Sequence, residues 1–204
     1  MKVALVQCPC YSIRFPPIGI AYLTAALKQA GHDVSVFDFN TDLYPHFPDR
    51  WRDDTYQDWL PVSFFLGEKE LNTWVDFFTD RIMEHDPEVI GFSIQVPSEI
   101  ISKAVARNIK KQDKTKIIVF GGPECSRANP ENYLDGSTAD FIVRGEGELT
   151  MIDLLKAVKD PRLLADCEGI VYRSGDSVIT NKPRPPQPWG ERRFPDFSVF
   201  DRGK

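Results

Sequence analysis

The sequence predicts a doubly wound α/β fold, in which helices cover both faces of a five-stranded parallel sheet, as in flavodoxin-like and Rossmann-like domains. Short apolar runs of strand length alternate along the chain with segments whose apolar residues recur at helical spacing. Strands that alternate with helices pair in parallel, because the helix carries the chain back across the sheet. Ligands bind such sheets at the carboxyl ends of the strands.

The first strand–helix–strand unit occupies the amino-terminal part of the chain. We expect a buried strand over residues 3–7 and, after a proline-rich turn, a helix over residues 20–27. Gly31 ends this helix, since glycine readily adopts the left-handed conformation that often follows a helix. The next strand, residues 33–39, completes the unit and predicts a parallel sheet.

The alternation continues to about residue 160 after an interruption. Residues 41–70 lose the periodicity but hold many aromatic residues, and we interpret them as an insertion or lid. The later periodicities predict strands that end at Ile94, Phe120 and Val143, and helices that begin near Leu71, Ile100 and Glu148. We therefore expect one domain over residues 1–160 that contains the aromatic insertion.

The pattern changes in residues 161–204. Two short runs rich in β-branched residues flank Ser174-Gly175-Asp176, which is typical of a β-hairpin. The prolines of residues 182–188 predict an extended connector, and the aromatic residues that follow it have no core left to bury them. We interpret this region as a hairpin and a linker toward a domain that is absent from this chain.

The composition excludes several classes of function. The chain has 204 residues, of which 42% are hydrophobic and 27% charged, with a net charge of −5, so a general nucleic-acid-binding surface is not expected. It has no apolar run of the roughly 18 to 20 residues that cross a membrane, and its start lacks the features of a signal peptide. The four cysteines lack the paired spacing of zinc or iron–sulfur sites. We expect a cytoplasmic protein with no metal held by its own side chains.

Two turns that follow consecutive strands are the candidate ligand site. The first is Gly121-Gly122-Pro123-Glu124, and the second is Arg144-Gly145-Glu146-Gly147. Glycine lets a ligand approach the main chain closely, and such turns offer backbone amides. Each turn taken alone is also compatible with ordinary strand-to-helix geometry.

The turn after the first strand argues against a phosphate-binding loop. Residues 8–19 match neither G-x-G-x-x-G nor G-x-x-x-x-G-K. Pro16 and Pro17 remove amide donors and favour an extended apolar loop, which suits a flat hydrophobic ligand better than a phosphate group. A response regulator would need a carboxylate and a lysine where the chain has Ser93 and Arg144.

Four segments carry a resemblance to a known family, namely Phe15–Leu23, Gly91–Ser93, Gly121–Glu124 and Arg144–Glu148. Over about residues 1–200, the sequence resembles the N-terminal cobalamin (B12)-binding domain of the cobalamin-dependent radical S-adenosylmethionine (SAM) enzyme family. The resemblance implies that the corrin ring lies over the carboxyl ends of the strands and that the nucleotide tail enters the crevice at the sheet edge. It implies cofactor contacts from Pro16, Pro17, Gly19, Ser93, Ile94, Gln95, Gly121, Gly122, Pro123, Glu124, Arg144, Gly145, Glu146 and Gly147.

The resemblance also has implications for cobalt ligation and for catalysis. The motif D-x-H-x-x-G, which supplies a histidine ligand in other cobalamin proteins, is absent, so base-off binding without a histidine ligand is implied. The cluster motif C-x-x-x-C-x-x-C is also absent. SAM and a [4Fe–4S] cluster are therefore expected only in a downstream domain, where methyl transfer or other radical chemistry would take place. We assign no catalytic residue to this chain.

Two alternatives stay open at this stage. The chain could be a stand-alone flavodoxin-like module for FMN or another nucleotide, or a cofactor-free interaction domain that keeps only the fold. Cobalamin binding predicts that a bulky residue in place of Gly122 blocks the corrinoid and leaves the fold intact.

Overall fold

The computed structural model describes residues 1–11, 13–47, 62–188, 190 and 192–200. Its centre is one seven-stranded sheet in the order β2-β1-β3-β4-β5-β6-β7. The strands are β1 (Lys2–Gln7), β2 (Asp33–Asp38), β3 (Val89–Ser93), β4 (Ile117–Gly121), β5 (Phe141–Val143), β6 (Ile170–Ser174) and β7 (Ser177–Thr180). The first five pair in parallel, in the flavodoxin-like order. The expected class is confirmed, but the expected count of five strands is wrong, because the hairpin β6–β7 joins the same sheet through β5.

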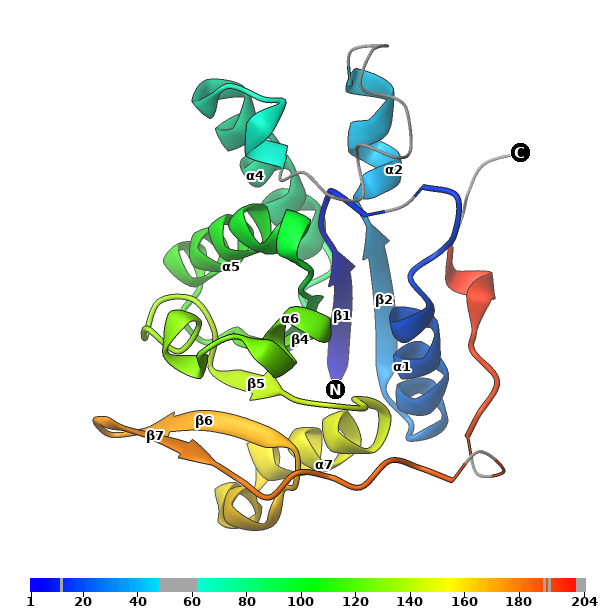
Figure 1. Cartoon of the computed structure of the whole chain (residues 1–204), viewed down its shortest axis with the longest axis vertical. Helices are drawn as coiled ribbons and strands as arrows, with labels where there is room; N and C mark the ends of the chain where they lie inside the picture. Colours follow the sequence, from blue (N-terminus) through cyan, green and yellow to red (C-terminus); the bar gives the residue numbers. More distant parts are fainter. Residues whose placement is uncertain (12, 48–61, 189, 191, 201–204) are drawn as a thin grey trace.

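Helices cover both faces of this sheet (Figure 1). The α-helices are α1 (Ile18–Gln29), α2 (Asn40–Leu43), α4 (Glu68–Met83), α5 (Glu99–Gln112), α6 (Pro123–Arg127) and α7 (Glu148–Lys159). Short 3-10 turns are η1 (Tyr44–His46), η3 (Val62–Phe64), η4 (Val96–Ser98), η5 (Pro130–Asn132), η6 (Pro161–Asp166) and η8 (Phe197–Val199). Helices α1 and α7 contact each other on one face, and α4 and α5 contact each other on the other.

The alternation of side chains along β1 explains why the sheet needs both layers. Val3 and Leu5 belong to the core beneath α1 and α7, whereas Ala4 and Val6 belong to the core beneath α4 and α5. All four are almost fully buried. A strand that is apolar on both faces is stable only when both are covered, which accounts for its continuous apolar sequence.

The carboxy-terminal segment folds back on its own domain. We call residues 181–188 and 192–200 the strap, because they run as an extended chain across α7 and then beside α1 (Figure 1). Arg184 pairs with Asp153 of α7 at 2.7 Å, and Asp196 pairs with Lys28 of α1 at 2.9 Å. The extended connector is confirmed, but the expectation that its aromatic residues find no core is wrong for Phe200, which packs against the core beneath α1 and α7.

The described ends of the aromatic insertion pack on the domain. Phe47 and Val62 are buried in the core beneath α4 and α5, and His46 contacts Trp74 of α4 edge-on. The central aromatic residues of the insertion lie outside the described residues.

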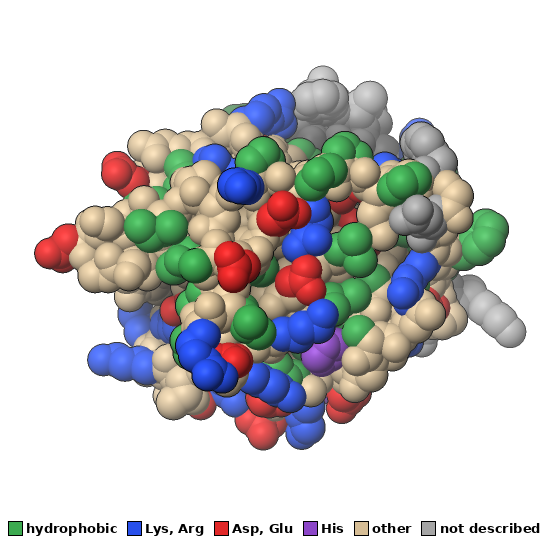
Figure 2. Space-filling model, turned by 90° about the horizontal axis from the view of Figure 1, so that it is seen from below, with side chains coloured by type: hydrophobic (Ala, Val, Ile, Leu, Met, Phe, Trp, Pro, Cys, Tyr) green, Lys and Arg blue, Asp and Glu red, His purple; other side chains and the backbone are tan. Residues whose placement is uncertain are grey.

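The face seen from below in Figure 2 carries acidic and basic side chains mixed together. Such a mixture does not form the single-sign basic patch that nucleic acids require. Within the described part of the chain, no helix is long and apolar enough to span a membrane.

Candidate cofactor-binding cavity

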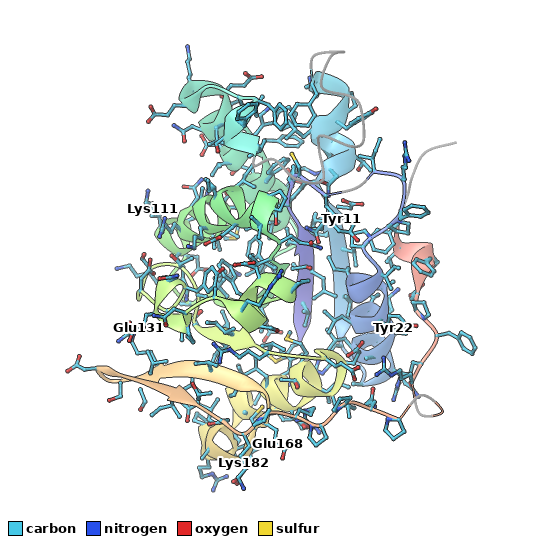
Figure 3. All side chains as sticks on the ribbon, in the orientation of Figure 1. Tyr11, Tyr22, Lys111, Glu131, Glu168 and Lys182 are labelled. Carbon is cyan, nitrogen blue, oxygen red and sulfur yellow. The ribbon has the colours of Figure 1, made fainter. Side chains whose placement is uncertain are left out.

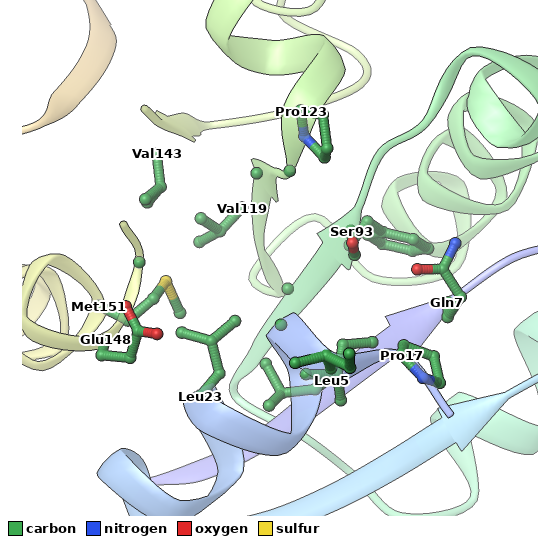
Figure 4. A pocket seen from close by; sticks show the side chains of 18 of the residues that line it. Leu5, Gln7, Pro17, Leu23, Ser93, Val119, Pro123, Val143, Glu148 and Met151 are labelled. Carbon is green, nitrogen blue, oxygen red and sulfur yellow. The ribbon is translucent and has the colours of Figure 1, made fainter. Parts of the chain in front are cut away.

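A cavity of about 350 Å³ opens at the carboxyl edge of the sheet, between the sheet and helices α1 and α7. Its wall is formed by the ends of β1, β3, β4 and β5 and by the first turns of α1 and α7 (Figure 4). The lining includes Leu5, Gln7, Tyr11, Pro17, Ile18, Gly19, Ile20, Leu23, Gly91, Phe92, Ser93, Gln95, Val119, Gly121, Gly122, Pro123, Val143, Gly145, Glu146, Gly147, Glu148 and Met151. This is the edge at which parallel α/β sheets bind ligands.

The floor of the cavity is apolar and owes its depth to a glycine. Gly91 lies at the middle of β3, on the face that packs beneath α1 and α7. A Cβ atom at this position would lie 3.2 Å from Leu5 Cδ2 and 3.9 Å from Met151 Cε. Because glycine has no side chain, the space between these two residues stays open. Leu23 and Val119 complete the apolar surroundings (Figure 4).

Residues at the carboxyl ends of four adjacent strands form a row, and those from β1, β3 and β4 lie at the mouth of the cavity. Gln7 pairs with Asp38 of β2, and Ser93 pairs with Gly121 of β4. Val6 pairs with Phe92, which places the next residues, Gln7 and Ser93, beside each other. Polar groups therefore line the mouth above the apolar floor.

Gly122 shapes the turn after β4 through its backbone conformation. Its φ of 97° and ψ of 178° lie in a region that is essentially restricted to glycine. A Cβ atom there would come within 2.7 Å of the Ile94 carbonyl oxygen and 2.8 Å of the Ile94 nitrogen. The expectation that a bulky residue at this position leaves the fold intact is therefore wrong. Gly121 differs, because its nearest contacts from an added Cβ, to Val143, are 3.7 and 3.8 Å.

The turn after β5 holds the strap as well as lining the cavity. Gly145 has a φ of 76°, and its amide donates to Ser126 Oγ at 3.3 Å. The Glu146 carboxylate accepts a hydrogen bond from the Gln187 amide at 3.0 Å and also pairs with the Arg192 guanidinium. The acidic group of this turn is thus engaged by the strap.

Most of the candidate cofactor contacts come together around this cavity. Those that line it are Pro17, Gly19, Ser93, Gln95, Gly121, Gly122, Pro123, Gly145, Glu146 and Gly147. Pro16, Ile94, Glu124 and Arg144 are not among the lining residues. Ile94 is fully buried in the core beneath α4 and α5, and Arg144 donates from Nη2 to the Ala128 carbonyl at 3.3 Å. The role of each as a cofactor contact stays a prediction.

Sequence reasoning missed the floor and part of the mouth. Leu5 and Met151 lie within apolar runs that read as ordinary core, and Leu23 and Gly91 belong to segments that carry the resemblance but were not expected to contact the cofactor. Gln7 was detectable, since it is a polar residue at the carboxyl end of an otherwise apolar strand.

The two cysteines after β1 face the core. Cys8 and Cys10 are 0% and 2% exposed and pack beneath α4 and α5. Burial raises the pKa of the Cys8 thiol to about 12, so it is protonated at neutral pH. Tyr11 lies above the end of β1 (Figure 3), and its amide donates to Asn40 Oδ1 at 2.6 Å. This contact fixes the start of the loop that leads to Pro17.

Histidine does not contribute to the described lining of the cavity. His46 contacts Trp74, and His85 contacts Phe37 edge-on at 5.1 Å. Among the described residues, no group of three or more histidine, cysteine or acidic side chains is arranged to hold a metal ion.

The fold and the cavity define a class, the parallel α/β domain that binds a ligand at the carboxyl edge of its sheet. Within this class, residues 67–155 match the family described as the B12 binding domain. This stretch contains β3, β4, β5 and both glycine turns. This match, over less than half of the chain, confirms the resemblance to a cobalamin-binding domain that was found in the sequence.

Curated relatives extend the similarity over almost the whole chain. An uncharacterized methyltransferase from Pyrococcus horikoshii is 26% identical over 192 residues, which cover 91% of this chain and 35% of the relative. An anaerobic magnesium-protoporphyrin IX monomethyl ester cyclase from Rubrivivax gelatinosus is 26% identical over 191 residues, covering 92% of this chain and 29% of the relative. The chain spans about a third of the length of these proteins.

Solved structures share the fold. The radical SAM methyltransferase TsrM from Kitasatospora setae superposes with a TM-score of 0.61 at 19% identity, covering 91% of this chain and 30% of that protein. The cobalamin-dependent SAM radical enzyme OxsB, solved with aqua-cobalamin and SAM bound, gives a TM-score of 0.61 at 20% identity, covering 91% of this chain and 22% of that protein. At these identities the similarity establishes the fold alone.

Proposed function

We propose that this chain is the cobalamin-binding domain of a radical SAM enzyme and that the cavity at the carboxyl edge receives the nucleotide tail of base-off cobalamin. The observation that carries the proposal is the glycine-floored cavity between Gly91, Gly121 and the start of α7, in a chain whose residues 67–155 match the B12 binding domain. A deep cavity beside parallel strands suits a long tail that inserts end-on.

The chemistry of the lining fits such a tail. An aromatic lower base is apolar, and the floor around Gly91, Leu23 and Met151 is apolar. A ribose and an amide linker are polar, and the mouth offers Gln7, Ser93 and Gln95. The exposed apolar side chains of Phe15 and Ile18, 64% and 52% exposed, belong to the loop before α1 and the start of that helix, and they offer contact area to a corrin face.

The chain's own residues would bind and orient the cofactor. Bound cobalamin supplies a cobalt centre for methyl-transfer or other radical chemistry. Gly121 allows close approach to the main chain, Ser93 offers a hydroxyl, and the apolar floor excludes water from the base. If the tail occupies the cavity, its base lies away from the cobalt, and the described lining offers no histidine to take the place of that base.

The activity of the whole protein is part of the same proposal. Relatives about three times as long carry methyltransferase or cyclase names, which supports a downstream radical SAM domain in cis that holds SAM and a [4Fe–4S] cluster. In this arrangement residues 1–160 bind the cofactor and residues 161–204 lead to the next domain. All four cysteines are free and buried, which suits a reducing compartment such as the cytoplasm.

Corrinoid binding tests the proposal directly. The chain is incubated with hydroxocobalamin or with FMN and passed over a gel-filtration column, and the absorption spectrum of the protein peak is recorded. We expect the corrinoid to co-elute and FMN not to. Co-elution of FMN alone would favour the flavodoxin-like module, and the absence of both would favour a cofactor-free interaction domain.

A cavity-filling variant locates the site. Gly91→Val adds methyl groups between Leu5 and Met151, and a β-branched residue suits a strand. We expect hydroxocobalamin to bind at least about tenfold more weakly, because the valine side chain and the tail would compete for the same space in the cavity. The matched control is Gly67→Val, where an added Cβ meets nothing within 4 Å and φ is −67°. Equal affinity of the two variants would exclude this cavity as the tail site.

A further inference from the structure

One side chain of the cavity has an unused hydrogen-bonding group. Gln7 is 0% exposed, and its Nε2 donates to the Cys8 carbonyl at 3.2 Å. Its Oε1 has no hydrogen-bond partner among the described residues. A buried acceptor without a partner is uncommon in folded proteins and calls for an explanation such as a missing ligand. Because Gln7 lines the cavity, a ligand there can supply the missing donor.

The orientation of the Gln7 carboxamide follows from its surroundings. The Cys8 carbonyl can only accept a hydrogen bond, so the amide nitrogen of Gln7 must face it. This fixes the assignment of oxygen and nitrogen, which geometry alone leaves open. The oxygen then lies on the other side of the amide, toward Ser93 and the cavity (Figure 4).

We propose that Gln7 recognises the nucleotide tail, its Oε1 accepting a hydrogen bond from an N–H or O–H group of the linker amide or the ribose. The inference rests on the proposed function and adds a residue that determines which ligand the cavity prefers. Gln7 stands in the polar row at the mouth and not at the apolar floor, so its partner is the polar part of the tail and not the base. Ser93 beside it can donate, so the two side chains together offer one acceptor and one donor.

A comparison of two corrinoids tests the role of Gln7. Cobalamin carries the nucleotide tail, and cobinamide lacks it while keeping the corrin ring. Gln7→Met has a similar length without the acceptor, and the matched control is Gln29→Met at the exposed end of α1. We expect Gln7→Met to bind hydroxocobalamin about tenfold more weakly than the wild type and to bind cobinamide equally well. Gln29→Met should leave both affinities unchanged.

Two results would overturn the inference. An unchanged ratio of cobalamin to cobinamide affinity in Gln7→Met would mean that the Gln7 oxygen does not contact the tail. A second variant, Gln7→Glu, is measured at about pH 5, where burial keeps such a carboxyl protonated. The protonated carboxyl can then donate to the Cys8 carbonyl and accept from the tail, as the amide of Gln7 would. This variant should bind cobalamin more tightly than Gln7→Met does, and weaker binding would refute the acceptor role.

Failure of the proposed function is distinguishable from failure of this inference. If the wild-type chain binds neither corrinoid, the proposed function and the role of Gln7 are both refuted. If the wild type binds cobalamin more tightly than cobinamide, and Gln7→Met keeps that preference, only the role of Gln7 is refuted.

Discussion

Replacing Gly122 with alanine is expected to destabilise the folded chain strongly, whereas the same change at Gly121 is tolerated. The two glycines are adjacent and both line the cavity, so they form a matched pair. Of the two, only Gly122 has a positive φ, and only there does an added Cβ overlap with backbone atoms, at 2.7 and 2.8 Å.

The magnitude follows from the local geometry. The conformation of Gly122 costs a residue with a side chain about 1–3 kcal/mol. The overlap adds a similar amount, because the Ile94 backbone is held on both sides: its nitrogen donates to the Gly121 carbonyl at 2.7 Å, and its carbonyl accepts from the Glu124 amide at 3.3 Å. The total loss is roughly 2–6 kcal/mol of unfolding free energy. For a chain of this size it lowers Tm by roughly 5–20 °C.

Thermal unfolding of the cofactor-free chain, followed by circular dichroism, measures this difference. We expect Gly121→Ala to unfold within about 2 °C of the wild type, because its nearest contacts from the added Cβ are ordinary van der Waals distances. A Gly122→Ala variant with the same Tm as Gly121→Ala would refute the argument from backbone strain and overlap.

Three further predictions concern other parts of the molecule. The four buried thiols should not react with Ellman's reagent at about pH 8 in the folded chain, because burial suppresses the reactive thiolate. All four should react after unfolding in guanidinium. Reaction in the folded chain would contradict the burial of these cysteines. Glu146→Gln weakens the ion pair with Arg192, so the hydrogen-exchange rate of backbone amides in the strap should rise about fivefold while the rates in the sheet stay unchanged. An equal rise in the strap and in the sheet would show that Glu146 does not act on the strap specifically. Burial opposes ionisation of Asp135, but hydrogen bonds from Ser137, Arg107 and Thr138 outweigh it and lower its pKa to about 2. Because the folded pKa lies below the unfolded value, ionised Asp135 stabilises the fold above about pH 4, and this stabilisation is lost as the pH falls toward 2. In urea unfolding, Asp135→Asn should therefore be less stable than the wild type at neutral pH, and the difference should shrink as the pH falls from about 4 toward 2. A difference that stays constant over this range would contradict the lowered pKa.

The positions of the strands and the ligand edge could be predicted because local patterns carry them. Apolar runs marked the strands, and the pair Gly121-Gly122 marked the turn after β4. The depth of the cavity could not be predicted in this way. Gly91 reads as one weak position in an apolar strand, and only the register that sets it against Leu5 reveals the open floor.

The same limit applies to the carboxy-terminal region. The hairpin followed from its turn residues, but its pairing with β5 depends on contacts between distant segments. The prolines of the strap indicated an extended chain and gave no sign of its direction. That direction depends on charge pairs between residues far apart in the sequence, such as Arg184 with Asp153 and Arg192 with Glu146.

The path of the strap determines where a domain that followed Phe200 would begin. Val199 and Phe200 share a cavity of about 240 Å³ with Asp38 and Thr41, at the carboxyl end of β2. The chain that leaves the hairpin is therefore brought back to the edge at which the cofactor cavity opens. A domain joined there by a short linker would be present at an effective concentration in the millimolar range. Its encounter with the bound cofactor would be intramolecular, so the two domains would need little affinity for each other and could separate after each turnover.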